Sequence, residues 1–153
     1  MTYSQYPISS KRQKGLEAIP TLSRDSFTNM KKWSLNEINN KLNILGDILP
    51  SLYNSDVRPV QCDHSIATIN DFLKYIRNLN FSVESLPLEL SKQTDKYKLS
   101  INLCSLEDQI LALYSLIRTL RPICREEINK RGEIQSEIQE QFEIILELSE
   151  QLA

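Results

Sequence analysis

A single apolar register runs through the C-terminal part of this 153-residue chain and constrains its fold more than any other feature. With Leu99 placed at heptad position d, thirteen of the sixteen a and d positions up to Leu152 are apolar, although only 41% of the chain is hydrophobic. Apolar residues repeated at a and d indicate helices that pack side by side. The aliphatic residues of this seam are Leu99, Leu103, Leu106, Ile110, Leu113, Ile117, Leu120, Ile134, Ile138, Ile145, Leu148 and Leu152.

Two residues inside this register decide between two arrangements of residues 93–153. Pro122 costs roughly 3 kcal/mol in a helix interior, and Gly132 follows two basic residues in a pattern typical of a helix end. Because residues 134–152 keep the heptad phase of residues 99–124, the sequence favours one long, kinked coiled-coil helix. The alternative is a helix pair with a hairpin at Gly132, which would give a compact four-helix bundle.

Three polar residues lie on the seam and define its weak points. A Gln at one d position, here Gln141, can fix register and partner choice. Glu127 and Arg131 are four residues apart and could pair along a helix. The favoured interpretation is that the seam opens to water at residues 127–131.

The chain before the seam has the spacing of a helical hairpin, and the predicted class is therefore all-α. The expected parts of residues 23–92 are helices at about 25–49 and 64–79 and a connector at 80–92. Residues 50–63 contain Pro50 and Pro59 and are expected to join the two helices. Ser34 and Glu37 fit a capping box, so either the first helix breaks near residue 34 or one helix runs through it.

Residues 1–22 are predicted to be a disordered basic tail. Pro7, Gly15 and Pro20 interrupt the segment, and it has no apolar period. Its basic residues Lys11, Arg12 and Lys14 could form a nuclear-import or phosphate-contacting patch. The alternative is a solubilising tail without a partner.

The composition favours a protein of a reducing compartment that does not insert into a membrane. The three cysteines, Cys62, Cys104 and Cys124, are far apart and odd in number, which fits a reducing compartment. No apolar run approaches the roughly 18 residues of a membrane helix, so no membrane insertion is expected. The expected location is nuclear, with the cytoplasm as the alternative.

No pattern in the sequence predicts catalysis, and we expect no enzyme, cofactor, metal site or small-molecule substrate. Cys62, Asp63 and His64 are three potential metal ligands in a row, but no second cluster would complete the coordination sphere. Three isolated glycines cannot form a phosphate-binding loop. Nucleic-acid binding is at best weak, because the net charge is −2 and no known module is present.

The length of the seam predicts partners. A continuous helix over residues 99–152 would be roughly 80 Å long, more than the two preceding helices could cover. We therefore expect other helical subunits to bind the seam, in a hetero-oligomer rather than a homodimer. The expected function is a non-enzymatic coiled-coil structural subunit of a nuclear assembly of the kinetochore, chromosome-organising or transcription-coactivator type. A cytosolic tethering or adaptor subunit in vesicle or cytoskeletal traffic is the alternative.

Overall fold

The computed structural model describes residues 24–87 and 93–152. The expected tail at 1–22, with Lys11, Arg12 and Lys14, lies outside the described residues, as do residues 88–92 of the expected connector. The elements are α1 (Arg24–Ile48), the 3-10 helix η1 (Leu49–Leu52), α2 (Pro59–Glu84), α3 (Gln93–Leu120) and α4 (Ile128–Gln151). The all-α class is confirmed, since no strand occurs in the part of the chain that the structure describes.

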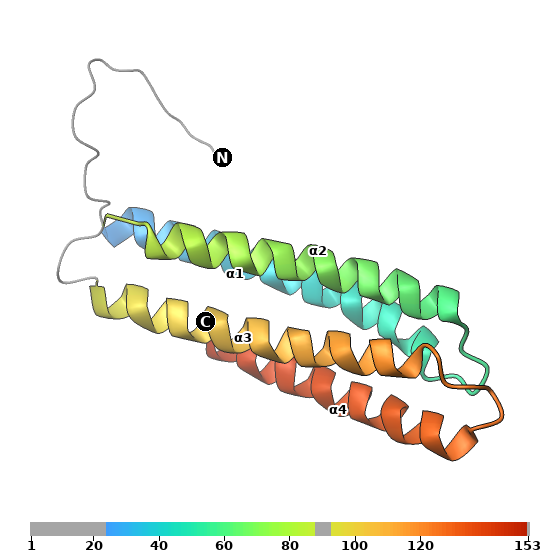
Figure 1. Ribbon diagram of the computed structural model, residues 1–153. Coiled ribbons are helices and arrows are strands. Elements are labelled where there is room, and N and C mark those ends of the chain that lie inside the picture. The colour runs from blue at the N-terminus through green and yellow to red at the C-terminus, as the bar shows by residue number, and fades with distance from the viewer. Residues whose placement is uncertain (1–23, 88–92, 153) are drawn as a thin grey trace.

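The four α-helices lie side by side and alternate in direction (Figure 1). The α1–α2 and α3–α4 connections meet at one end of the bundle, which we call the closed end. The backbones of α2 and α3, and of α3 and α4, approach each other most closely, whereas α1 lies more loosely against α2 and α4. The helix that begins the seam, α3, is therefore covered on two sides by helices of its own chain.

The apolar seam forms the centre of this bundle. Ten of its twelve residues are buried, from Leu99 at 5% exposed to Ile110 at 0%. The remaining two, Ile134 and Leu148, are partly buried and pack against the same core. The other helices contribute an inward-facing stripe of their own, which includes Ile38, Leu42, Leu45, Ile69, Phe72 and Ile76.

The expected continuous helix is wrong, because the chain turns back between α3 and α4. Pro122 has no amide hydrogen to continue the helix beyond Leu120, and residues 121–127 form the connection. These seven residues equal one heptad, so the seam resumes in α4 with an unchanged phase. The hairpin alternative also misplaced the turn, because Gly132 lies inside α4.

The first helix is continuous, which decides the question that Ser34 and Glu37 left open. α1 runs through both residues, and Ser34 is buried on its inward face. The Ser34 hydroxyl lies 3.6 Å from the sulfur of Met30 and donates to it. Ser34 therefore does not cap a helix.

The second helix is longer at both ends than the predicted residues 64–79. Pro59 occupies its first turn, where a missing amide hydrogen costs nothing. The Gln61 side-chain oxygen accepts a hydrogen bond from the Arg58 backbone amide at 2.8 Å and strengthens this start. At the other end, Ser85 donates from its backbone amide to the Phe81 carbonyl at 3.1 Å.

Candidate functional site

Polar contacts join α2 and α3 from the middle of the bundle toward the end opposite the closed end. The Arg77 guanidinium donates from Nε to the Glu107 carboxylate at 2.7 Å. The Asn80 side chain accepts from the Ser100 hydroxyl at 2.9 Å and donates to the Cys104 sulfur at 3.1 Å. Asn80 is itself buried, so these contacts satisfy a polar group that faces the edge of the core.

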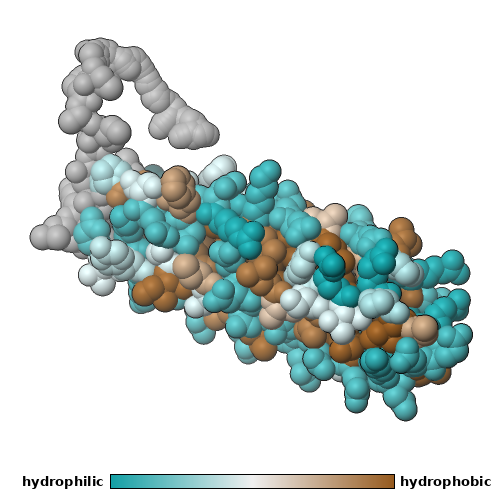
Figure 2. All heavy atoms as spheres, in the orientation of Figure 1, coloured by the Kyte–Doolittle hydropathy of each residue, from teal (hydrophilic) through white to brown (hydrophobic). Residues whose placement is uncertain are grey.

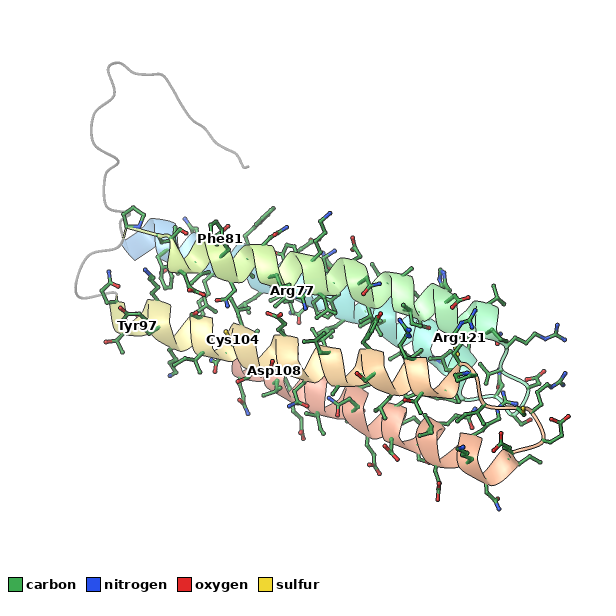
Figure 3. The ribbon with its side chains drawn as sticks, in the orientation of Figure 1. Arg77, Phe81, Tyr97, Cys104, Asp108 and Arg121 are labelled. Carbon is green, nitrogen blue, oxygen red and sulfur yellow. The ribbon has the colours of Figure 1, made fainter. Side chains whose placement is uncertain are left out.

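Three large apolar side chains are exposed beside these contacts, and we call them the α2–α3 patch. Phe81 is 75% exposed, Ile101 65% and Tyr97 61%. Phe81 follows Asn80 in α2, Ile101 follows Ser100 in α3, and Tyr97 precedes Ile101 by one helical turn. Figure 3 shows Phe81 and Tyr97 at the end where α2 stops and α3 starts. The same face otherwise carries hydrophilic side chains with apolar ones scattered between them (Figure 2).

Sequence reasoning missed this patch, although a signal for it was present. Tyr97 and Ile101 occupy heptad positions b and f, which face away from a coiled-coil seam. A large apolar residue at such a position has no core to enter, so its exposure follows from the register. Phe81 carried no comparable signal, because the predicted second helix ended before it.

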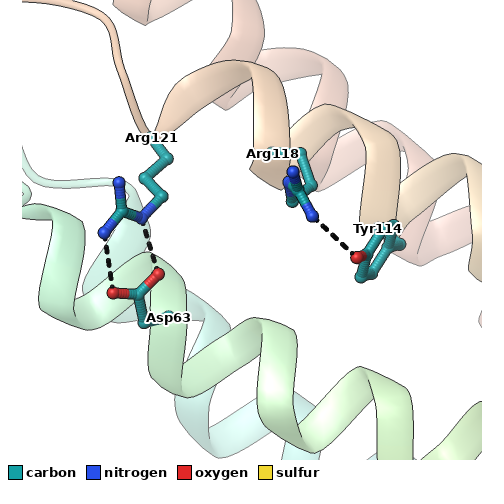
Figure 4. A network of polar contacts seen from close by, with 4 residues as sticks. All are labelled: Asp63, Tyr114, Arg118 and Arg121. Carbon is teal, nitrogen blue, oxygen red and sulfur yellow. Dashed lines mark hydrogen bonds and ion pairs between the residues drawn. The ribbon is translucent and has the colours of Figure 1, made fainter.

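A bidentate ion pair ties α2 to the end of α3 at the closed end (Figure 4). Arg121 donates from Nε and Nη2 to the two Asp63 oxygens, at 2.6 and 3.0 Å. These hydrogen bonds hold the pKa of the Asp63 carboxyl below its ordinary value and raise that of the Arg121 guanidinium. One turn earlier, Arg118 donates to the Tyr114 hydroxyl at 2.9 Å.

A buried arginine lies at the same end of the bundle, in the first turn of α4. Arg131 is 3% exposed and donates from Nη2 to the Val57 carbonyl at 2.6 Å. Its Nε and Nη1 are buried without a hydrogen-bond partner among the residues that the structure describes. The possible pair with Glu127 does not form, and the Glu127 carboxylate lies 3.7 Å from the Lys130 ammonium instead. The expected opening to water is confirmed for residues 127–130, which are exposed, and is wrong for Arg131.

A pocket of about 300 Å³ lies at the closed end, between the α1–α2 and α3–α4 connections. Arg58, Arg121 and Arg125 line it, together with the apolar side chains of Val57, Leu120 and Ile123. Cys62 and Cys124 also belong to its lining. Cys62 is buried, and this burial, followed by the charge of Asp63, raises the pKa of its thiol. We call this the closed-end pocket.

The expected partner-binding seam is inside the molecule. The premise that the chain cannot cover its own seam is wrong, since α1, α2 and the α3–α4 hairpin enclose it. The polar seam residue Gln141 is satisfied within the chain, because its side-chain amide donates to the Gln109 backbone carbonyl and side-chain oxygen, both at 2.8 Å. Any partner therefore has to bind the outer surface.

Among the described residues, no group of three or more His, Cys, Asp or Glu side chains is placed to hold a metal ion. Of the potential ligands in the Cys62 to His64 run, Cys62 is buried and Asp63 is held by Arg121. No helix in this part of the chain is both long enough and apolar enough to span a membrane. The chain matches no protein-family model, no curated protein and no solved structure.

Proposed function

We propose that this chain is a non-enzymatic helical subunit that binds an amphipathic helix of another protein across the α2–α3 patch. The observation that carries the proposal is the exposure of Phe81, Tyr97 and Ile101 at one level of two adjacent helices. Large apolar side chains gathered on a surface mark interaction sites. Aromatic residues are also enriched among the few side chains that carry most of the energy of an interface.

The geometry of the patch suits a helix better than an extended peptide. Tyr97 and Ile101 are spaced as i and i+4 along α3, and Phe81 lies on the neighbouring α2. A partner helix with apolar residues at i, i+3, i+4 and i+7 would place them between these anchors and Phe81. The described residues form no strand, so they offer no strand edge to which an extended peptide could add.

The proposed setting is a nuclear multi-protein assembly of the kinetochore, chromosome-organising or transcription-coactivator type. In support, Cys62, Cys104 and Cys124 are all free thiols, which fits a reducing compartment. This observation fits a cytosolic tethering or adaptor subunit equally well. The basic residues Lys11, Arg12 and Lys14 favour the nucleus of the two.

The interaction surface is tested with a pair of double variants. Phe81→Ser with Ile101→Ser removes two patch side chains, and Trp33→Ser with Val60→Ser removes two residues of similar exposure, 70% and 68%, elsewhere on the bundle. The proteins are expressed at native level in their own cells and purified with their stoichiometric partners. We expect the wild type and the Trp33/Val60 variant to retain the same helical partner and the patch variant to lose it.

Binding of the purified partner is then measured directly. The patch variant should bind at least about tenfold more weakly, the effect of losing one good apolar anchor. The proposal is wrong if the patch variant keeps the partner with unchanged affinity, or if the wild-type chain has no stoichiometric partner in its cells.

The nuclear setting is tested by changing Lys11, Arg12 and Lys14 to Ala together. A fluorescently tagged wild-type chain should accumulate in the nucleus, and the triple variant should distribute between nucleus and cytoplasm. A wild-type chain that is confined to vesicles or filaments would favour the tethering function instead.

A further inference from the structure

The closed-end pocket concentrates positive charge in a chain that is negative overall. The chain carries a net charge of −2, yet Arg58, Arg121 and Arg125 line one pocket of about 300 Å³ and no Asp or Glu does so. Within the described part of the chain, Arg58 and Arg125 form no ion pair, whereas the third guanidinium is engaged by Asp63. Two exposed guanidinium groups are therefore free to bind a ligand.

A buried charge next to the pocket adds to this potential. Arg131 donates to the carbonyl of Val57, whose side chain lines the pocket. The Nε and Nη1 of Arg131 have no partner, and no described carboxylate forms an ion pair with it. A buried charge without a counter-charge is costly. An anion in the neighbouring pocket would offset part of this cost, because charges interact strongly through a weakly screened interior.

The local carboxylates are already engaged or stand outside the pocket. Asp63 is bound by Arg121, and Glu127 lies 3.7 Å from Lys130. Asp56 and Glu126 are exposed on the two connections but do not line the pocket. These carboxylates lie on the two connections or in the first turns of α2 and would repel an extended polyanion such as a nucleic acid, which needs a continuous basic surface. The arrangement instead suits one compact anionic group.

We propose that the closed-end pocket binds a phosphomonoester, namely a phosphorylated serine or threonine side chain of a partner protein. Guanidinium groups bind phosphate oxygens in pairs through their planar forks, and Arg58 and Arg125 take this role. The apolar wall of Val57, Leu120 and Ile123 contacts the aliphatic stem to which the phosphate is attached. This assignment rests on the proposed function only in one respect, that the phosphorylated side chain belongs to a partner protein.

The test uses the full chain and a small probe, N-acetyl-O-phosphoserine amide. Binding is followed by nuclear magnetic resonance of the backbone and arginine side-chain N–H groups at constant ionic strength, with inorganic phosphate and N-acetylserine amide as comparison probes. We expect saturable shifts centred on residues 57–62 and 120–125. The phosphoserine probe should bind more tightly than inorganic phosphate, because only the probe has a stem to contact the apolar wall. The unphosphorylated probe should not bind.

Two double variants separate pocket recognition from general electrostatics. Arg58→Gln with Arg125→Gln removes two charges from the pocket, and Arg118→Gln with Lys130→Gln removes two charges from the same end but outside the pocket lining. The pocket variant should weaken probe binding at least about tenfold, as expected for losing charge-assisted hydrogen bonds. The Arg118/Lys130 variant should change the affinity for the probe by no more than about twofold, the size of a screened surface effect.

Three results would overturn the proposal: no saturable binding of the phosphoserine probe, an equal loss in both double variants, or binding of inorganic phosphate as tight as that of the probe. Failure of the proposed function is distinguishable from these. If the Phe81/Ile101 variant leaves partner binding unchanged but the probe still saturates the pocket, only the α2–α3 interface is wrong.

Discussion

The polar contacts at the closed end join residues that are distant in the sequence. Asp63 and Arg121 are far apart in the chain, yet their two hydrogen bonds join α2 to the first residue of the α3–α4 connection. The lowered pKa of Asp63 is a direct consequence of this contact. The same end holds Arg131, whose buried guanidinium has one carbonyl as its only described partner.

The Asp63–Arg121 pair predicts a specific dependence of stability on pH. Because the pKa of Asp63 is lower in the folded than in the unfolded chain, the pair stabilises the fold above the unfolded pKa, near 4. This contribution is lost as the pH falls through the folded pKa. Between pH 7 and pH 3, the melting temperature of the Asp63→Asn variant should therefore fall by less than that of the wild type. Asp56→Asn, at an exposed loop residue, is the control, and an unchanged pH dependence in Asp63→Asn would contradict the role of the pair.

Gly132 should be a site of simple stabilisation. It lies inside α4, and an added Cβ would have no heavy atom within 4 Å. Alanine restricts the unfolded chain and favours the helix, so Gly132→Ala should raise the free energy of unfolding in urea by about 0.5–1 kcal/mol. A loss of stability would mean that residue 132 is in a turn.

The four helices illustrate what heptad spacing can and cannot predict. The existence of α1 and α3 and the inward positions of the seam follow directly from the spacing of apolar residues. The helix ends do not, because Pro59 marks a turn and a helix start equally well. The turn between α3 and α4 was missed for a geometric reason. Its seven residues preserve the heptad phase, so periodicity alone cannot distinguish it from a continuous helix.

The seam residues should act on the stability of the isolated chain. Leu113 lies in the C-terminal half of α3 and is 0% exposed. Its replacement by alanine leaves a cavity where the helices meet, and Leu113→Ala should cost about 2–5 kcal/mol in urea unfolding. Ile101→Ala, on the same helix but 65% exposed, should change stability by no more than about 0.5 kcal/mol. Similar effects of the two substitutions would mean that the seam faces outward.

The bundle as a whole brings together residues that no sequence pattern connects. Arg58 belongs to the α1–α2 connection, and Arg121 and Arg125 belong to the α3–α4 connection. They share one pocket only because both connections lie at the closed end (Figure 1). The candidate sites therefore depend on the packing of all four helices. This packing could not be predicted from the spacing of apolar residues, whereas the composition of the core could.

Because the chain covers its own seam, it should fold without a partner. We expect the purified protein to be a monomer in multi-angle light scattering at micromolar concentration and to unfold in one cooperative transition that does not depend on concentration. A melting temperature that rises with concentration would instead indicate that a second chain completes the core.

The return of α4 along α3 is the central claim, and one intramolecular distance tests it. Gln141 contacts Gln109, so Ser115 lies level with about residue 135. Spin labels carried by non-natural residues at Ser115 and Gln151, both exposed, leave the native cysteines in place. The hairpin predicts a separation of about 25 Å by electron paramagnetic resonance, and a continuous helix predicts about 54 Å, at a rise of about 1.5 Å per residue. A single distance population near 25 Å is the expected result, and one near 54 Å would contradict the account.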